Sequence, residues 1–377
     1  MPSISSPMGS DARLAVAICV STAIVLCAPF LGQLRAAVRA SFPNRFAIIV
    51  GGSVAVAVMA ALVVALVSVR NHRPTRYGAI AAALAIAIVY ILLMRTGIPE
   101  VDAVESVHFV EFGAIALLFY RAWRPLGDSA TFLLPVLAGL LVGTLDEWLQ
   151  WFIPNRVGEA RDVFLNLVAI SCGLMFGAAL EPPAGFAFRL PPVSRRLVAT
   201  TTALVFVVFA AFVNAVHLGY LVVVPEIGAF KSHYTLDGLR QLSNDRADRW
   251  RHDPPLVLRR LSREDQYLDE GLWHVRERNQ RWSAGDYETA WRENQILETL
   301  FEPVLDTKTY AAAGLHRWPP EQKSDAQQRA RAQHPSGFMS AAEPYPILTL
   351  GKRPFWAGVA VGVLVLLYVG RRSRASS

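Results

Sequence analysis

The chain has 377 residues, of which 53% are hydrophobic and only 18% are charged. A soluble domain usually carries about 25% charged residues, so this composition argues against an ordinary soluble protein. The net charge is +7, but Pro225–Arg353 holds 19 basic and 19 acidic residues, so the surplus lies among the apolar segments. That distribution is typical of membrane anchoring and not of nucleic-acid binding. The three cysteines lie in apolar runs and indicate neither a disulfide framework nor a cysteine metal site.

Eight apolar runs predict transmembrane helices. A helix needs about 20 residues to cross about 30 Å of hydrocarbon, and lipid offers the backbone no hydrogen bonds outside a helix. The predicted spans are Leu14–Leu34, Phe46–Val69, Gly78–Met94, Val107–Phe119, Thr131–Ile153, Val163–Leu180, Leu197–Val224 and Phe355–Val369. The first run could instead be a signal peptide, with Val38-Arg39-Ala40 as an imperfect cleavage site.

Arginine placement predicts the orientation of these spans, because cytoplasmic loops are enriched in Lys and Arg. With both termini in the cytoplasm, the inner side holds Arg70, Arg73, Arg76, Arg121, Arg124, Arg189, Arg195, Arg196, Arg371, Arg372 and Arg374. One loop, with Arg35, Arg39 and Arg45, falls on the outer side against this trend. The orientation makes Pro225–Arg353 extracytoplasmic.

The segment from Pro225 to Arg353 is too polar to span and is expected to form an α-rich domain. Helical periodicity is present in Arg259–Trp282 and in Asp286–Leu305, whereas Gln327–Gly337 resembles a polar linker. The predicted fold is an all-α membrane protein. Its parts are N-terminal spans in 1–99, core spans in 100–180, a seventh span with its preceding loop in 181–224, the extracytoplasmic domain in 225–353, and a last span with a basic tail in 354–377.

Three consecutive predicted spans carry polar residues near one end, although a charge in the hydrocarbon costs about 2.5–3.5 kcal/mol. These residues are His108 and Glu111 in the fourth span; Asp146, Glu147 and Gln150 in the fifth, followed by Arg156; and Asp162 and Asn166 around the start of the sixth. Residues three or four apart share a helix face. Because the spans alternate in direction, the sequence predicts one polar cluster near the outer leaflet.

The stretch LDEWLQWFIPNRVGEARDVFLNLVAISCG, with VHFVEFGAIALL upstream, resembles the VanZ-like family of integral membrane proteins. The family signature is an Asp-Glu pair followed by Gln, Arg, Asp and Asn, after a helix with a His-Phe pair. The matching residues are Asp146, Glu147, Gln150, Arg156, Asp162, Asn166, His108 and Phe109. The sequence departs from the pattern at Glu105, Phe112 and Ala169, where Lys, Tyr and Gly are frequent, which bears on the detailed hydrogen bonding. About residues 100–180 are covered.

The resemblance implies a role in the bacterial cell envelope, at the cytoplasmic membrane, because the family's namesake lowers sensitivity to the lipoglycopeptide teicoplanin. It supplies no reaction, so two hypotheses stay open. The first is an enzyme-like site for a lipid-linked envelope molecule, with Glu147 or Asp146 as acid or base and His108 as its partner. The binding residues would be Gln150, Arg156, Asp162, Asn166 and Glu111. The second is a protein that binds, masks or helps to move an amphiphile without altering it.

Plainer interpretations of the same residues remain. Asp146 and Glu147 could form an interhelical clamp with Arg156 or Arg161, because charges inside a membrane pair with one another. His108 could lie at the interface, or it could join the carboxylates around a divalent cation such as Mg²⁺ or Ca²⁺. Asn166 could serve helix packing beside the small residues that follow it.

Overall fold

The computed structural model describes residues 9–153, 158–255, 263–308, 314–330 and 337–371. The chain separates into two compact units. The first, the helical unit, consists of Met1–Leu149, Glu159–Ala211 and Gly358–Ser377. The second, the polar domain, consists of Gln150–Gly158 and Phe212–Ala357.

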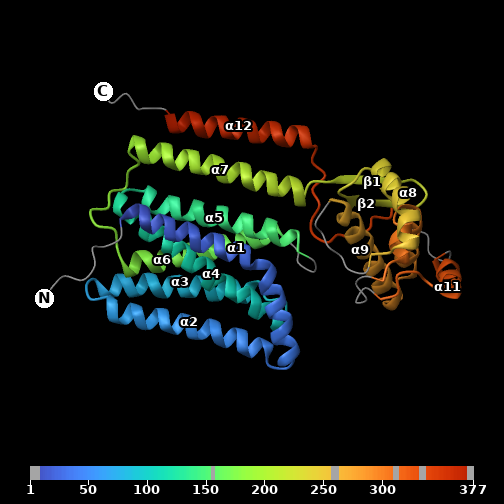
Figure 1. The fold of residues 1–377 in the computed structure, drawn as a ribbon, viewed down its shortest axis with the longest axis horizontal. Coiled ribbons are helices and arrows are strands. Elements are labelled where there is room, and N and C mark those ends of the chain that lie inside the picture. Colours follow the sequence, from blue (N-terminus) through green and yellow to red (C-terminus); the bar gives the residue numbers. More distant parts are fainter. Residues whose placement is uncertain (1–8, 154–157, 256–262, 309–313, 331–336, 372–377) are drawn as a thin grey trace. The chain divides into compact units, whose positions relative to one another are not determined.

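Eight helices of the described chain are long and apolar enough to cross a membrane, as predicted. They are α1 (Ser10–Ser41), α2 (Phe46–Ser68), α3 (Arg73–Leu93), α4 (Pro99–Trp123), α5 (Ala130–Trp151), α6 (Ala160–Leu180), α7 (Pro192–Val216) and α12 (Lys352–Arg371). A short 3-10 turn, η1 (Arg124–Leu126), follows α4. The helices alternate in direction, so α1 begins and α12 ends at one end of the helical unit, the terminal end (Figure 1). The protein is an all-α, multi-pass membrane protein.

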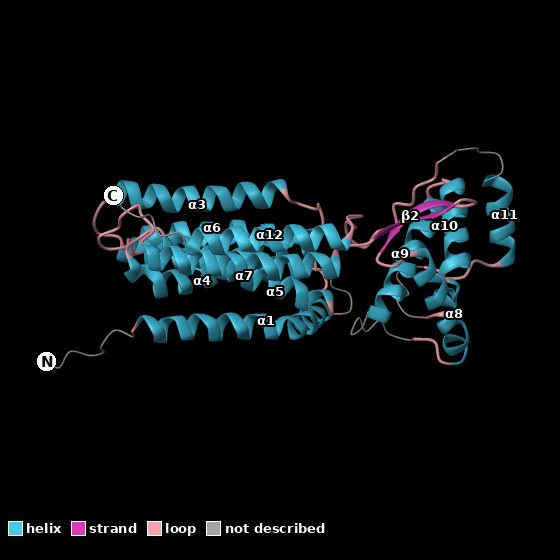
Figure 2. Ribbon diagram, turned by 90° about the horizontal axis from the view of Figure 1, so that it is seen from above, coloured by secondary structure: helices cyan, strands magenta, loops and turns pink. Residues whose placement is uncertain are grey.

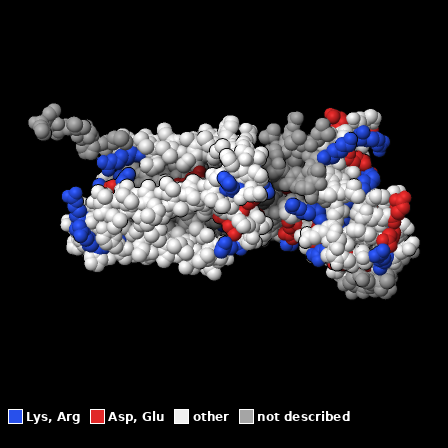
Figure 3. Space-filling model, turned by 90° about the horizontal axis from the view of Figure 1, so that it is seen from below, with Lys and Arg blue, Asp and Glu red and all other residues white. Residues whose placement is uncertain are grey.

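Helices α4 and α6 form the centre of the helical unit. In the most apolar part of α6, 61% of the residues are buried, whereas in the corresponding part of α2 none is buried. Helix α4 contacts α1, α2 and α6, and α6 also contacts α3. Phe112, Ile115, Ala138, Ala169 and Ile170 belong to the buried core. The flank shown in Figure 3 is nearly free of charge between its two ends, as expected of a surface that faces lipid.

Two glycines bring α4 and α6 into backbone contact. A Cβ atom at Gly173 would lie 2.5 Å from the Cα of Gly113, so only glycine fits at that position. One turn further along α6, a Cβ at Gly177 would lie 2.7 Å from the Leu117 side chain. Small residues at helix contacts are typical of membrane proteins, because close backbones maximise van der Waals packing. This contact fixes how α4 and α6 are aligned along their length.

In its described residues, the polar domain combines a small hairpin with several α-helices (Figure 2). The elements are β1 (Tyr220–Val224), β2 (Gly228–Ser232), α8 (Leu236–His252), α9 (Arg263–Ser283), α10 (Tyr287–Leu300), the 3-10 turn η2 (Glu302–Asp306) and α11 (Pro320–Ala330). The strands are antiparallel, with Val222 paired with Phe230. Both side chains join a buried core with residues such as Tyr267, Leu297 and Phe301.

Several sequence-based boundaries need correction. The seventh span was predicted to reach Val224, but α7 ends at Val216 and Tyr220–Val224 is strand β1. The apolar run continues past the helix because β1 buries Val222 and Val224 against the domain core. Gly219 permits the change of direction, since a Cβ there would lie 2.3 Å from the Ser232 carbonyl oxygen.

The helix predictions in the polar domain were correct for α9 and for most of the second stretch, which is α10 followed by η2. Residues 259–262, at the start of the first stretch, lie outside the described residues. The linker prediction was wrong for 327–330, which belong to α11, and 331–336 are not described. Helix α8 was not predicted at all, and the fourth span is longer than expected, running from Pro99 to Trp123.

Candidate functional site

The candidate site is built on a three-helix contact inside the helical unit. A Cβ atom at Gly143 of α5 would lie 3.1 Å from the side-chain nitrogen of Asn166 on α6 and 3.3 Å from the Phe112 ring on α4. Phe112 and Asn166 are completely buried. The missing side chain at Gly143 therefore lets the three helices meet at one level, which sets their register.

One helical turn away, the same faces carry ionisable residues. Helices α4 and α6 begin at the end opposite the terminal end, here called the cluster end, and α5 runs toward it. His108 precedes Phe112 by four residues, Asp162 precedes Asn166 by four, and Glu147 follows Gly143 by four. Since residues four apart lie on one helix face, these three side chains project from contacting faces at a common level. The His108 and Phe112 rings stack with centroids 5.9 Å apart, which confirms their shared face.

The acidic residues of α5 are deeply buried. Asp146 is 4% exposed and Glu147 is 1% exposed, whereas Glu111 on α4 is half-buried. Gln150, in the last turn of α5, is also buried. None of these residues, nor His108 or Asp162, is without an interaction partner. Buried carboxylates need such partners, because transfer of an unpaired charge out of water is very costly.

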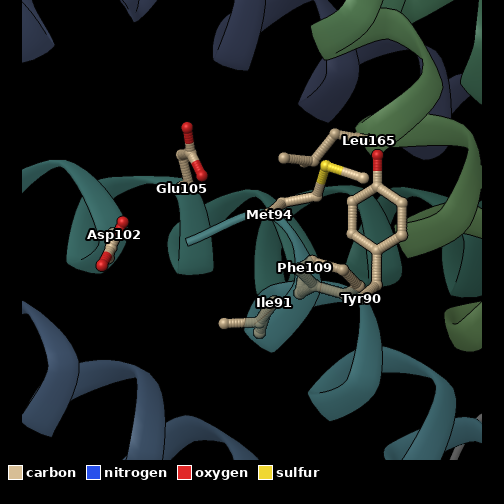
Figure 4. A pocket seen from close by; sticks show the side chains of 7 residues that line it. All are labelled: Tyr90, Ile91, Met94, Asp102, Glu105, Phe109 and Leu165. Atoms are coloured by element: carbon tan, nitrogen blue, oxygen red, sulfur yellow. The ribbon is translucent and has the colours of Figure 1, made fainter. Parts of the chain in front are cut away.

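A narrow pocket lies beside this cluster, between α3, α4 and α6 (Figure 4). Its lining includes the carboxylates of Asp102 and Glu105 and the phenol of Tyr90. Glu105 lies 3.7 Å from the Arg161 guanidinium, and Asp102 accepts hydrogen bonds of 2.8 Å from the Thr96 backbone nitrogen and hydroxyl. The pocket holds only about 10 Å³, which is room for about one water molecule. This pocket therefore has polar walls but no room for a ligand larger than water.

Residues 24–181 match the protein-family model described as VanZ/LLP1. Over these residues the chain is VanZ-like. Searches of curated proteins and of solved structures gave no significant match. The matched residues extend from within α1 to the end of α6, so they include all three helices of the cluster. The polar domain of this VanZ-like protein lies outside the match, apart from the few residues between α5 and α6.

Helix geometry places several of the expected cluster residues near one level of α4, α5 and α6. His108, Glu147 and Asp162 share one level, and Asp146 and Glu111 lie beside them along their helices. Arg156 is outside the described residues, so its expected place in the cluster stays a prediction. Sequence reasoning missed Tyr90 on α3, although a tyrosine near the end of an apolar span was a usable signal.

Asn166 has a different environment from the residues predicted with it. Its side chain is completely buried, and neither amide atom has a hydrogen-bond partner in the described part of the VanZ-like chain. It lies beneath the ionisable residues and fills the contact with Gly143. That position supports the packing interpretation at least as well as direct ligand binding.

A divalent cation was one option for the cluster. Among the described residues, no three His, Cys, Asp or Glu side chains are grouped closely enough to hold a metal ion. The arrangement of this VanZ-like site therefore gives no ligand set for Mg²⁺ or Ca²⁺ within those residues. What it offers is hydrogen-bond acceptance by carboxylates, proton exchange with an imidazole, and a guanidinium at the rim.

Proposed function

We propose that this VanZ-like envelope protein recognises the polar headgroup of a lipid-linked cell-envelope molecule at the cluster end. The observation that supports the proposal is the meeting of α4, α5 and α6 at Phe112, Gly143 and Asn166, since His108, Glu147 and Asp162 lie four residues from these toward the cluster end. Carboxylates accept hydrogen bonds from sugar hydroxyls and amines, and the Arg161 guanidinium at the rim suits a phosphate. The protein would thereby alter sensitivity to glycopeptide or lipoglycopeptide antibiotics.

Within this proposal, the buried carboxylates and the imidazole are the groups that can move a proton. Glu147 or Asp146 would act as acid or base and His108 as its partner, while Glu111, Gln150, Arg156, Asp162 and Asn166 would bind or orient the headgroup. A carboxyl group and an imidazole at one level in a low-dielectric site are suited to general acid–base work. Hydrolysis or group transfer on the bound lipid would follow from this arrangement.

We also propose that the cluster end faces the outer leaflet of the bacterial cytoplasmic membrane, with both termini in the cytoplasm. Basic residues at the terminal end support this orientation: Arg70, Arg73, Arg76, Arg121, Arg124, Arg189, Arg195, Arg196 and Arg371. The loops and helix ends at the cluster end have fewer, and Glu100, Asp102 and Glu105 lie among them. Cytoplasmic loops carry the excess of Lys and Arg, so the terminal end is the cytoplasmic one and the polar domain is extracytoplasmic.

The test is complementation of cells that lack the protein. Glu147→Gln removes the charge of a buried group at nearly constant shape, and it should abolish complementation under lipoglycopeptide challenge while the protein stays at normal abundance in the membrane. Glu100→Gln is the matched control, because Glu100 lies on the same helix end as the cluster but pairs with the exposed Arg39 at 2.9 Å. Full complementation by Glu147→Gln would falsify the proposal and leave the cluster as a folding clamp.

Binding without reaction is the second candidate, and the small volume of the pocket favours it. About 10 Å³ cannot enclose a headgroup, so a ligand would lie against the surface of the cluster end. Purified protein that retains a lipid-linked envelope molecule unchanged after incubation would support this candidate. A product that accumulates with time and depends on Glu147 would exclude it in favour of the enzyme.

A further inference from the structure

A sizeable cavity of the helical unit lies at the terminal end, away from the polar cluster. It is an open groove of about 430 Å³ between α7 and α12, lined by Arg196, Ala199, Thr200, Leu367, Gly370 and Arg371. This volume is within the usual range for small-molecule sites, about 300–1,000 Å³. One arginine comes from each helix, and the remaining lining is small or apolar apart from the Thr200 hydroxyl.

The two helices touch at the floor of this groove. A Cβ atom at Gly370 would lie 2.7 Å from the Cβ of Ala199, and a Cβ at Gly362 would lie 2.7 Å from the Phe206 ring. Thr200 donates its hydroxyl to the carbonyl oxygens of Arg196 and Leu197 on its own helix, at 2.9 and 3.0 Å. The groove is therefore a notch between packed helices, with its polar wall supplied by the arginines.

Other arginines at the terminal end already have structural partners. Arg121 lies 2.7 Å from a carboxylate oxygen of Glu181, and Arg124 pairs with the second oxygen of the same group. Arg76 donates hydrogen bonds to the carbonyl oxygens of Ala179 and Leu180. These contacts tie α3, α4 and η1 to the end of α6, and they leave the charges satisfied.

Arg196 and Arg371 differ from those arginines. Neither has an acidic partner in the part of the chain that the structure describes, and both side chains are exposed. Two like charges held on neighbouring helices repel each other unless an anion lies between them. Guanidinium groups favour phosphate, which they bind through paired hydrogen bonds.

We propose that the groove between α7 and α12 binds the phosphate of an anionic phospholipid. The phosphate lies between Arg196 and Arg371, and an acyl chain follows Leu367 and the exposed apolar face of α12, which includes Leu364 and Val365. Both helices span the membrane, so the groove opens at the level where headgroups meet hydrocarbon. The site is independent of the function proposed for the cluster end, because it uses other helices and the opposite end of the bundle.

The experiment is a lipid titration of the full-length protein in detergent, followed by native mass spectrometry. Phosphatidylglycerol is the probe and phosphatidylcholine is the neutral comparison. The double variant Arg196→Gln/Arg371→Gln should bind phosphatidylglycerol at least about tenfold more weakly than the wild type, since each basic group near an anionic lipid contributes a factor of about five to affinity. Binding of phosphatidylcholine should be weak in both proteins.

The matched control is Arg70→Gln/Arg189→Gln. It removes the same two charges at the same end, from exposed loop positions that do not line the groove. Phosphatidylglycerol affinity within about twofold of the wild type is expected for this control, well under the roughly tenfold loss expected of the groove variant. Equal losses in the two double variants would show general charge attraction and overturn the site.

Two further arms distinguish a lipid held in the groove from simple charge loss and from a soluble anion. Thr200→Trp keeps both arginines but fills the groove from an exposed position, so it should weaken phosphatidylglycerol binding; wild-type binding by this variant would refute the assignment even if the double variant failed to fold. Inorganic phosphate at equal concentration should not displace the lipid. Displacement by phosphate would reassign the groove to a soluble anion.

Discussion

His233 has a hydrogen-bond acceptor at each ring nitrogen. Its Nδ1 lies 2.6 Å from a carboxylate oxygen of Glu270, and its Nε2 lies 2.6 Å from the carbonyl oxygen of Val216. The carbonyl oxygen can only accept, so Nε2 carries a proton, and the carboxylate of Glu270 favours a second proton on Nδ1, which makes the ring an imidazolium. Glu270 also accepts a hydrogen bond from the Ser232 hydroxyl at 2.6 Å. This buried network joins the end of α7, strand β2 and helix α9.

The charge on His233 makes the stability of the polar domain depend on pH. Burial disfavours the charged ring, but the hydrogen bond and charge of Glu270 outweigh it, so the pKa of His233 is raised. A raised folded-state pKa contributes stability that is complete below the unfolded value, about 6.5, and is lost as the pH rises through the folded value. The pKa of nearby His217 is shifted in the opposite direction. Burial lowers it, and the neutral ring donates a hydrogen bond from Nδ1 to the Pro346 carbonyl oxygen.

We therefore expect amide hydrogen exchange at Ser232 and His233, corrected for intrinsic rates, to accelerate as the pH is raised above neutrality. His233→Gln should remove that dependence and destabilise the domain by about 3 kcal/mol, because it leaves Glu270 without its buried counter-charge. The same exchange profile in the variant and the wild type would show that the imidazolium does not hold the hairpin.

At the scale of elements, the two glycines at the α4–α6 contact differ in how much room each leaves for a side chain. A Cβ at Gly173 meets the Cα and carbonyl oxygen of Gly113 at 2.5 Å, and backbone cannot move aside. At Gly113 there is room for a methyl group, because a Cβ atom there would come no closer than 3.8 Å to Gly173. The asymmetry arises because the two Cα–Cβ directions differ, although the backbones touch at one place.

Gly173→Ala should destabilise the protein by about 2 kcal/mol, since overpacking forces the helices apart. Gly113→Ala, with identical chemistry, should change stability by no more than about 1 kcal/mol, and the better helix propensity of alanine favours it. Chemical unfolding in detergent, followed by circular dichroism, measures both. Equal effects of the two substitutions would contradict the contact. Because the Gly173 contact sets how α6 is aligned with α4, its variant should also weaken complementation.

At the scale of the whole molecule, the arrangement of spans predicts which positions water-soluble reagents reach. Helices alternate in direction, and α1 begins where α12 ends, so one side of the membrane holds both ends of the described chain. The basic loops lie on that side, which should be cytoplasmic. The polar domain, inserted between α7 and α12, is expected on the other side.

Cysteine labelling in intact cells checks this orientation. After Cys19, Cys27 and Cys172 are replaced by serine or alanine, a cysteine at the exposed position Asp237 in α8 should react with a membrane-impermeant maleimide. A cysteine at Arg73, the first residue of α3, should react only after the membrane is permeabilised. The reverse pattern would invert the topology and place the polar cluster in the inner leaflet.

The spans and the residue types of the cluster could be predicted from sequence because both depend on local patterns. The length of an apolar run decides whether a helix crosses the bilayer, and spacing by four decides which residues share a face. Alternation of the spans then places Glu147 and Asp162 near the same leaflet. These properties need no knowledge of which helices touch.

Only the tertiary structure decided how those faces meet. The contact of Phe112, Gly143 and Asn166 aligns three helices, and no pattern within one helix specifies that alignment. The strand at Tyr220–Val224 replaced an expected helix end because its partner, Gly228–Ser232, and the core behind it favour a hairpin over a longer span. Likewise, in the sequence Arg196 and Arg371 are ordinary arginines that flank membrane spans, and only the packing of α7 against α12 places both at one groove. Contacts between segments far apart in the chain depend on side-chain shape and packing, which local periodicity does not contain.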